Sequence, residues 1–195
     1  MKRLWIVVLV FLAQAGLVDA SNRFGIHASY WDTAEADGSE GVGFFLTTPA
    51  ANEGHLVFDF RVTWYQDISE EPGTELEVIP IELGFSAHSN PQGRFDAYLG
   101  AGIGWNLMEG RSDRALGGSS KFKDDGEFGY YAVLGTELTI GGASTKLEAS
   151  RICLFVEGLY RGVDIGSVDS GVLGDDPSNG DLSGGVVQAG IVFHW

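Results

Sequence analysis

The feature of this sequence that most constrains its fold is an alternation of apolar and polar residues with a period of two. One stretch has apolar residues at Leu56, Phe58, Phe60, Val62 and Trp64. Because successive side chains of a β-strand point to opposite faces, such alternation predicts strands with one apolar face. It recurs in eight segments, which we expect to be strands: 23–31, 40–47, 56–65, 79–86, 95–107, 128–140, 151–157 and 187–195.

The first twenty residues form a separate segment. Lys2 and Arg3 precede the apolar run Leu4–Leu17, and the small residues around Ala20 follow it. This run is shorter than the ~20 residues that cross a bilayer as a helix. Positive residues, a short apolar run and a small-residue site are typical of a signal peptide. We therefore expect residues 1–20 to be a cleaved signal peptide and residues 21–195 to be one exported domain.

The connections between the predicted strands alternate in length. Short connections with turn residues occupy 48–53, 89–93 and 141–146, whereas mostly longer, polar ones occupy 32–39, 66–74, 109–127 and 163–181. In an up-and-down sheet, alternate connections lie at the same end. Short turns at one end, longer loops at the other and an even number of strands are typical of outer-membrane barrels. The sequence thus predicts an eight-stranded antiparallel up-and-down transmembrane β-barrel.

Two arrangements of the faces are compatible with alternation. A soluble lipocalin-like barrel turns its apolar face inward to a ligand cavity, whereas a membrane barrel turns it toward lipid. Here the apolar face is bulky and aromatic, while the other face is rich in Gly, Ser and charge, which favours the membrane barrel. Aromatic residues near strand ends are also expected to form interfacial girdles: Tyr30, Trp31, Trp64, Tyr65, Trp105, Tyr160 and Trp195.

Charge and cysteine content exclude several classes of function. Twelve Lys and Arg against 27 Asp and Glu give a formal net charge of -15, which argues against a nucleic-acid partner. One cysteine excludes an intramolecular disulfide, and the four histidines match no metal-ligand spacing, so we expect neither a metal site nor a cofactor. The acidic loops, such as 163–181, are expected to be solvated surface, with divalent-cation binding as the alternative.

The final strand resembles the C-terminal insertion signal of bacterial outer-membrane proteins. It carries Ile191, Phe193 and Trp195 at alternate positions, although Phe is the usual last residue. The stretches 78–84 and 97–106 are similar to strands of the small porin-like outer-membrane β-barrel family, which includes the membrane domain of outer-membrane protein A. The resemblance implies residence in the bacterial outer membrane, contact with its lipid and lipopolysaccharide, and recognition of the final strand by the barrel-assembly machinery.

Charged residues at inward positions form the candidate functional site. The predicted lumenal charges are Asp59, Arg61, Glu82, Asp96, Glu137, Arg151, Glu157 and Arg161. Isolated buried charges are costly, so these must be paired, and we expect Glu137 to pair with Arg151 on the neighbouring strand. The set forms either an internal ion-pair network or a narrow gated ion path. The network is favoured, because eight strands leave little room for water.

A lipid-modifying activity is a weaker alternative. His27 and Ser29 have the spacing of the His and Ser in lipid A deacylases, but they lie on the inward face of the first strand, and no acidic residue can be assigned to orient the histidine. We therefore predict no catalytic residue. The expected role is non-enzymatic: structural, surface-interacting or a minor pore, with a lipid-A-modifying enzyme or a soluble ligand-binding barrel as the alternatives.

Overall fold

The structure is a computed structural model that describes residues 22–34, 38–51, 54–66, 74–114, 118–144, 149–165 and 180–195. The expected signal peptide, residues 1–20, lies outside the described residues. Among those residues, no helix has the length and apolar character needed to cross a bilayer.

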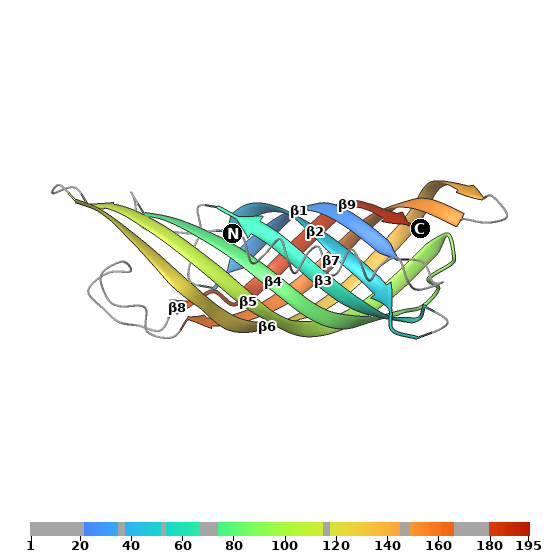
Figure 1. The fold of residues 1–195 in the computed structure, drawn as a ribbon, viewed down its shortest axis with the longest axis horizontal. Coiled ribbons are helices and arrows are strands. Elements are labelled where there is room, and N and C mark those ends of the chain that lie inside the picture. Colours follow the sequence, from blue (N-terminus) through green and yellow to red (C-terminus); the bar gives the residue numbers. More distant parts are fainter. Residues whose placement is uncertain are drawn as a thin grey trace.

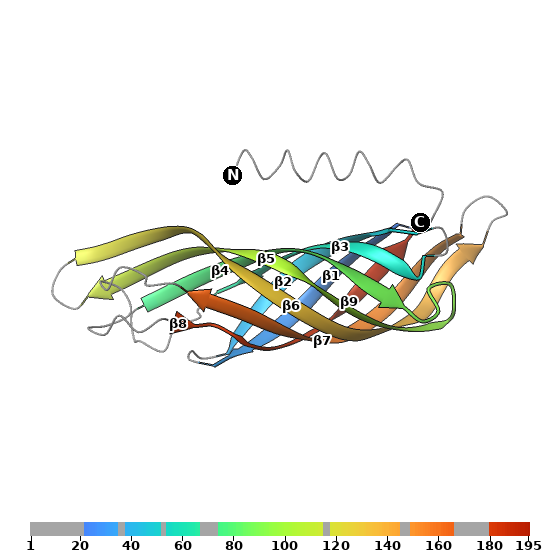
Figure 2. The ribbon, with the colours of Figure 1, turned by 90° about the horizontal axis from the view of Figure 1, so that it is seen from below.

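The described residues form a closed antiparallel β-barrel (Figures 1 and 2). Each strand of the wall pairs with the next, and the last, β9, pairs with β1 to close the barrel. A two-residue strand, β8 (Gly180–Asp181), pairs with the end of β7. The predicted fold class is therefore confirmed. The eight wall strands are β1 (Arg23–Thr33), β2 (Ser39–Pro49), β3 (Leu56–Tyr65), β4 (Thr74–His88), β5 (Phe95–Arg114), β6 (Gly118–Ser144), β7 (Ala149–Ile165) and β9 (Gly184–His194).

Alternate connections lie at the same end of the barrel, as expected for an up-and-down sheet. The turns that follow β2, β4 and β6 lie at one end, the turn end, and the connections that follow β1, β3, β5 and β7 lie at the other, the loop end (Figure 1). Arg23 at the start of β1 pairs with His194 at the end of β9, so both lie at the turn end.

The expected loop 109–127 is wrong, because these residues extend two strands. β5 continues to Arg114 and β6 begins at Gly118, and the two stay paired through this region, with a register shift between Asn106 and Met108. Gly126, on β6 opposite this shift, adopts a φ of 104°, which glycine tolerates best. The segment lacks apolar alternation, but backbone pairing between two strands does not require an apolar face. β6 likewise runs to Ser144, past the expected start of the turn at 141.

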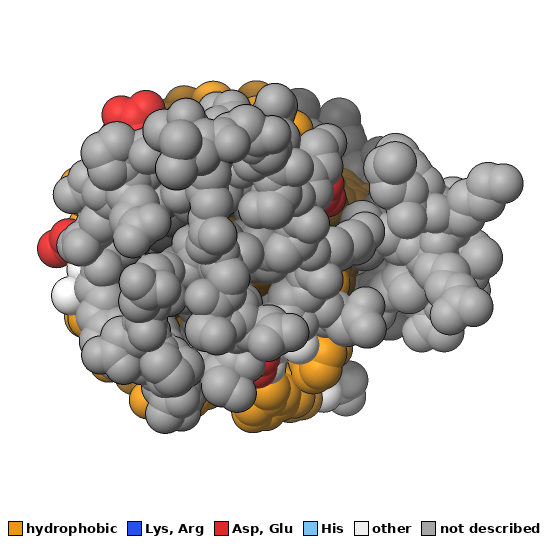
Figure 3. Space-filling view, turned by 90° about the vertical axis from the view of Figure 1, so that its left-hand side faces the viewer, with side chains coloured by type: hydrophobic (Ala, Val, Ile, Leu, Met, Phe, Trp, Pro, Cys, Tyr) orange, Lys and Arg blue, Asp and Glu red, His pale blue; other side chains and the backbone are white. Residues whose placement is uncertain are grey.

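The outward face is apolar. Leu99 and Leu134 are 63% and 68% exposed, and other large hydrophobic side chains share this face on all eight wall strands. In the view from the loop end, hydrophobic side chains border the barrel where described residues are visible (Figure 3). A closed barrel with an apolar exterior has no unpaired wall edge and suits a lipid environment.

The aromatic girdle is only partly as predicted. Tyr30 and Trp64 point outward, as do Trp105, Tyr160 and Trp195, but Trp31 and Tyr65 are fully buried in the lumen. Adjacent strand residues point to opposite faces, so the pairs Tyr30–Trp31 and Trp64–Tyr65 cannot both face lipid. The two inward rings pack edge to face inside the lumen, with 5.1 Å between their centres.

Candidate functional site in the barrel lumen

All eight predicted charges are placed on the inner face of the barrel. Seven are buried and Arg151 is half-buried. The structure adds Arg23, His88 and His194, which are also buried. These side chains form three clusters along the barrel: a loop-end cluster around Arg161, a central cluster around Arg61 and a turn-end cluster around Arg23.

The loop-end cluster is a two-pronged ion pair. Arg161 on β7 donates from Nε to Glu82 Oε1 at 2.7 Å and from Nη2 to Glu82 Oε2 at 3.0 Å. Its Nη1 donates to the Tyr65 hydroxyl at 2.7 Å. The guanidinium carbon also lies 5.3 Å from the ring centres of Trp31 and Tyr65. A buried charge is tolerated when it is paired and hydrogen-bonded in this way.

The central cluster joins opposite walls of the barrel. Arg61 on β3 donates to Glu157 on β7, and the Tyr98 hydroxyl donates to the second oxygen of Glu157 at 2.7 Å. The Arg61 guanidinium lies over the rings of Phe45 and Tyr131, at 5.4 and 5.8 Å. Two aromatic rings from β2 and β6 therefore flank the guanidinium of this ion pair.

The remaining two acidic residues, Asp59 and Asp96, differ in their hydrogen bonds. Asp59, two residues before Arg61 on β3, is 1% exposed, and neither of its carboxylate oxygens meets a donor in ordinary hydrogen-bond geometry within the described chain. Asp96 contacts His88 Nδ1 at 2.6 Å and accepts a bond from the backbone N–H of Asn90 at 2.8 Å.

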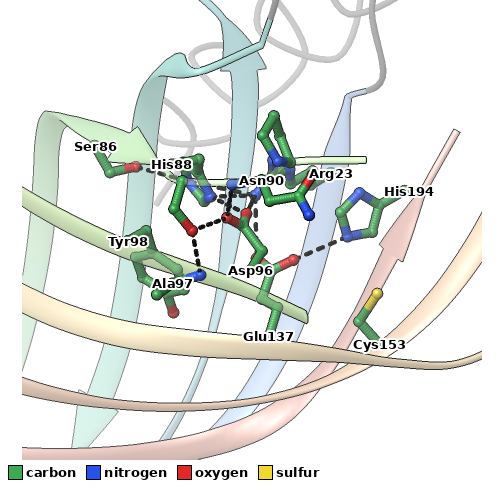
Figure 4. A network of polar contacts seen from close by, with 12 residues as sticks. Arg23, Ser86, His88, Asn90, Asp96, Ala97, Tyr98, Glu137, Cys153 and His194 are labelled. Carbon is green, nitrogen blue, oxygen red and sulfur yellow. Dashed lines mark hydrogen bonds and ion pairs between the residues drawn. The ribbon is translucent and has the colours of Figure 1, made fainter. Parts of the chain in front are cut away.

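The turn-end cluster is a shared network rather than a single pair (Figure 4). Arg23 on β1 donates from Nη1 to Glu137 Oε1 on β6 at 3.1 Å, and its Nη1 lies 3.9 Å from Asp96 Oδ2. Glu137 Oε2 lies 3.1 Å from His194 Nε2 on β9. One carboxylate therefore links β1, β6 and β9 where the barrel closes.

The expected pair of Glu137 and Arg151 is wrong. Glu137 is opposite Phe155 on β7, whereas Arg151 is opposite Gly142, so the two are far apart in register. Arg151 instead donates to the carbonyls of Pro91 and Gly93, at 2.6 and 3.2 Å, in the turn after β4.

Arg23 is a functional candidate that the sequence analysis missed. It begins the first strand, and its acidic partner lies on β6, which is neither adjacent to β1 nor near it in sequence. Alternation from His27 back to Arg23 does place both residues on the same inward face. That signal predicts a lumenal arginine but not its partner.

His27 and Ser29 do not form a nucleophile pair with a carboxylate. His27 Nε2 lies 3.1 Å from Thr63 Oγ1, and its Nδ1 has no hydrogen-bond partner in the part of the chain that is described. Both side chains are buried in the lumen. The acidic segments 67–71 and 169–176 lie outside the described residues, so the divalent-cation alternative stays a prediction.

Comparison with known proteins supports the fold. No family model and no curated protein matches this sequence. Among solved structures, the chain is similar to the outer membrane protein OprG from Pseudomonas aeruginosa, with a TM-score of 0.59 and 10% identity over 90% of this chain and 96% of that one. It is also similar to Neisserial surface protein A, with a TM-score of 0.53 and 13% identity over 88% of this chain and 94% of that one. A third similar structure is Ail, the attachment invasion locus protein of Yersinia pestis, with a TM-score of 0.51 and 10% identity over 91% of this chain and 100% of that one.

These likenesses confirm, at the level of fold, the predicted resemblance to small outer-membrane β-barrels. They extend over nearly the whole of each matched chain and about nine-tenths of this one, so the chain has the fold of a small outer-membrane barrel. Identities of 10–13% carry no residue-level role to this sequence.

Proposed function

We propose that this chain is a non-enzymatic barrel of the bacterial outer membrane whose lumen is closed and whose role is structural or surface-interacting. The observation that carries the proposal is the set of ion pairs that cross the lumen. A barrel closed in this way presents its loops and its apolar wall, rather than a channel, to its surroundings.

The ion pairs join walls that are not neighbours in the sheet. Arg61 and Glu157 join β3 to β7, which are four strands apart in either direction around the barrel. Arg161 and Glu82 join β7 to β4, while Arg23 and Glu137 join β1 to β6. A solute would have to separate these buried charges in turn, and an uncompensated buried charge costs several kcal/mol. The rings of Phe45 and Tyr131 occupy space beside the Arg61 guanidinium.

The face arrangement disfavours the two other classes. A soluble ligand-binding barrel needs an apolar cavity, but this lumen holds buried charges and filled aromatic packing, while the apolar side chains point outward. A lipid-modifying enzyme needs a nucleophile that reaches lipid, yet His27 and Ser29 point inward.

The partners follow from the outer face. The exposed apolar wall suits outer-membrane lipid and lipopolysaccharide. Ile191, Phe193 and Trp195 on or next to β9 are 36%, 39% and 49% exposed, which leaves this alternate row accessible to an assembly machinery before insertion. Residues 1–20 serve in this proposal as the export signal.

Conductance in planar lipid bilayers tests the proposal. The folded wild-type barrel should show no steady channel openings, whereas the double variant Arg61→Ala/Glu157→Ala should show them, because it removes the central crossing pair. Tyr130→Phe, on the outer face, is the matched control and should stay closed. Regular channel openings of the wild type would contradict the closed barrel and favour the minor-pore role.

A further inference from the structure

Three potential metal ligands converge at the turn end of the lumen, beside the Arg23 network. They are Glu137 on β6, Cys153 on β7 and His194 on β9 (Figure 4). A carboxylate oxygen, the thiol sulfur and an imidazole nitrogen all lie within 4.8 Å of one another. Their residues are 5%, 2% and 2% exposed, so the group is shielded from solvent.

The wall of the barrel holds these three side chains in place. Cys153 is directly opposite Thr139 on β6 and Val192 on β9, and Glu137 and His194 each lie two residues from those partners. The three ligands are therefore diagonal neighbours on one face of three adjacent, hydrogen-bonded strands. A site on strands is positioned more rigidly than a site on loops.

The donor set selects a class of metal. Thiolate and imidazole are ligands of zinc and related transition metals, whereas Ca²⁺ and Mg²⁺ prefer oxygen ligands alone. We propose that Cys153 Sγ, His194 Nε2 and Glu137 Oε2 bind one divalent transition-metal ion of the zinc class, with water as a fourth ligand. Sequence spacing does not indicate this site, because the three ligands come from separate strands.

The residues around the ligands are compatible with a bound cation. The two carboxylate oxygens of Glu137 can act separately. Oε1 keeps its hydrogen bond from Arg23 at 3.1 Å, while Oε2, which lies beside His194 in this structure, binds the metal. A residue that hydrogen-bonds to a metal ligand, as Arg23 does to Glu137, fixes the orientation of that ligand. Of the two nearby arginines, Arg23 is paired with Glu137 and lies 3.9 Å from Asp96. Arg151 is half-buried and directs its Nη atoms to turn carbonyls.

Binding requires two proton shifts. The Cys153 thiol loses its proton to solvent as the thiolate–metal bond forms. His194 presents Nε2 to the metal and carries its proton on Nδ1, which now lies 3.3 Å from Arg151 Nη2. Arg151 can give up this contact, because it keeps its shorter bond to the Pro91 carbonyl at 2.6 Å.

The site would link the strands that close the barrel. β9 joins β7 to β1, so a metal held by β6, β7 and β9 fastens one side of this closing strand. This inference does not depend on whether the lumen conducts. It adds a ligand to the folded state and should raise resistance to unfolding when metal is present.

Cobalt(II) titration of the folded barrel in detergent micelles tests the site. Co²⁺ substitutes for Zn²⁺ and gives a thiolate-to-cobalt absorption band, which must come from Cys153 because the chain has a single cysteine. We expect the band to saturate at one Co²⁺ per chain and to be lost on addition of Zn²⁺. Cys153→Ala should abolish the band, and His194→Ala should weaken binding at least tenfold. His27→Gln, a lumenal histidine outside the site, should bind as the wild type does.

A second measurement separates loss of the site from loss of the fold. Heat-modifiable migration in electrophoresis reports whether each variant is folded, and Zn²⁺ should slow alkylation of Cys153 in the wild type at least tenfold but not in folded His194→Ala. Absence of the cobalt band in the folded wild type would overturn the proposal, including the case in which Co²⁺ binds only to oxygen ligands of the acidic loops. Undiminished binding by His194→Ala would overturn it as well.

Discussion

The inner and the outer face of this barrel are made by the same strands but are stabilised in different ways. Outside, Leu99 and Leu134 present apolar surface and make no polar pair. Inside, Glu82 and Arg161 depend on each other through two short hydrogen bonds. Outer residues should therefore contribute independently and according to membrane depth, whereas inner residues should contribute as pairs.

The largest effect is expected from breaking one partner of an inner pair. Glu82→Ala or Arg161→Ala should each lower the free energy of unfolding by about 3–5 kcal/mol, because the remaining charge is buried without compensation. The double variant Glu82→Leu/Arg161→Met should be nearly neutral. Urea unfolding in lipid vesicles, followed by tryptophan fluorescence, measures all three. Additive losses in the double variant would show that these charges are separately solvated.

A charge placed on the outer face should have a depth-dependent effect. Leu99→Arg should lower the free energy of unfolding by about 2–4 kcal/mol if Leu99 lies near the bilayer midplane. Phe95→Arg, at the turn-end start of β5, should cost only about 0–1 kcal/mol, as expected near the interface. The same vesicle assay applies, and equal losses at both positions would contradict a membrane-embedded outer face.

Removal of one hydroxyl compares the two faces most directly. Tyr98→Phe should lower the free energy of unfolding by about 1.5–3 kcal/mol, because its hydroxyl donates to the buried carboxylate of Glu157. Tyr130→Phe, whose side chain is 58% exposed on the outer face, should change stability by less than about 0.5 kcal/mol. Equal effects at the two tyrosines would contradict the distinction between the faces.

The smallest effect concerns two glycines. A Cβ at Gly158 meets no atom within 4 Å, so Gly158→Ala should stabilise the barrel by about 0.5–1 kcal/mol. A Cβ at Gly102 would collide with the Leu83 carbonyl and the Tyr131 ring, so Gly102→Ala should destabilise it. Thermal unfolding of both variants gives the sign of each change, and the same sign at the two positions would contradict the packing described here.

The sequence predicts the strands and their faces well, because alternation depends only on local geometry. Leu99 and Glu82 lie on the faces that the period of two assigns to them. Partner choice is harder to predict, since Glu137 meets Arg23 only after the barrel closes. The observed register places Glu137 opposite Phe155 and not beside Arg151. Alternation does not predict the paired ends of β5 and β6 near Arg114, because backbone pairing between two strands needs no apolar face.

The candidate site follows the same division. Alternation alone assigns the eight charged residues to the lumen. The partners of Arg23, His88 and His194 cannot be predicted in this way, because they depend on neighbours that the closed sheet supplies. Trp31 and Tyr65 show the opposite error, as aromatic character suggested an interface where the alternation places them inside.

The pairing of β1 with β9 has a consequence for the order of assembly. Arg23 meets His194 from almost the opposite end of the chain, so this seam cannot form until the final strand has been synthesised and delivered. Pairings between such distant segments form slowly, because the chain loses conformational entropy before the stabilising contacts form. Until β9 arrives, the backbone groups at the free edge of β1 have no strand to pair with. This edge must be protected before the barrel closes, although the closed barrel shows no sign of that need.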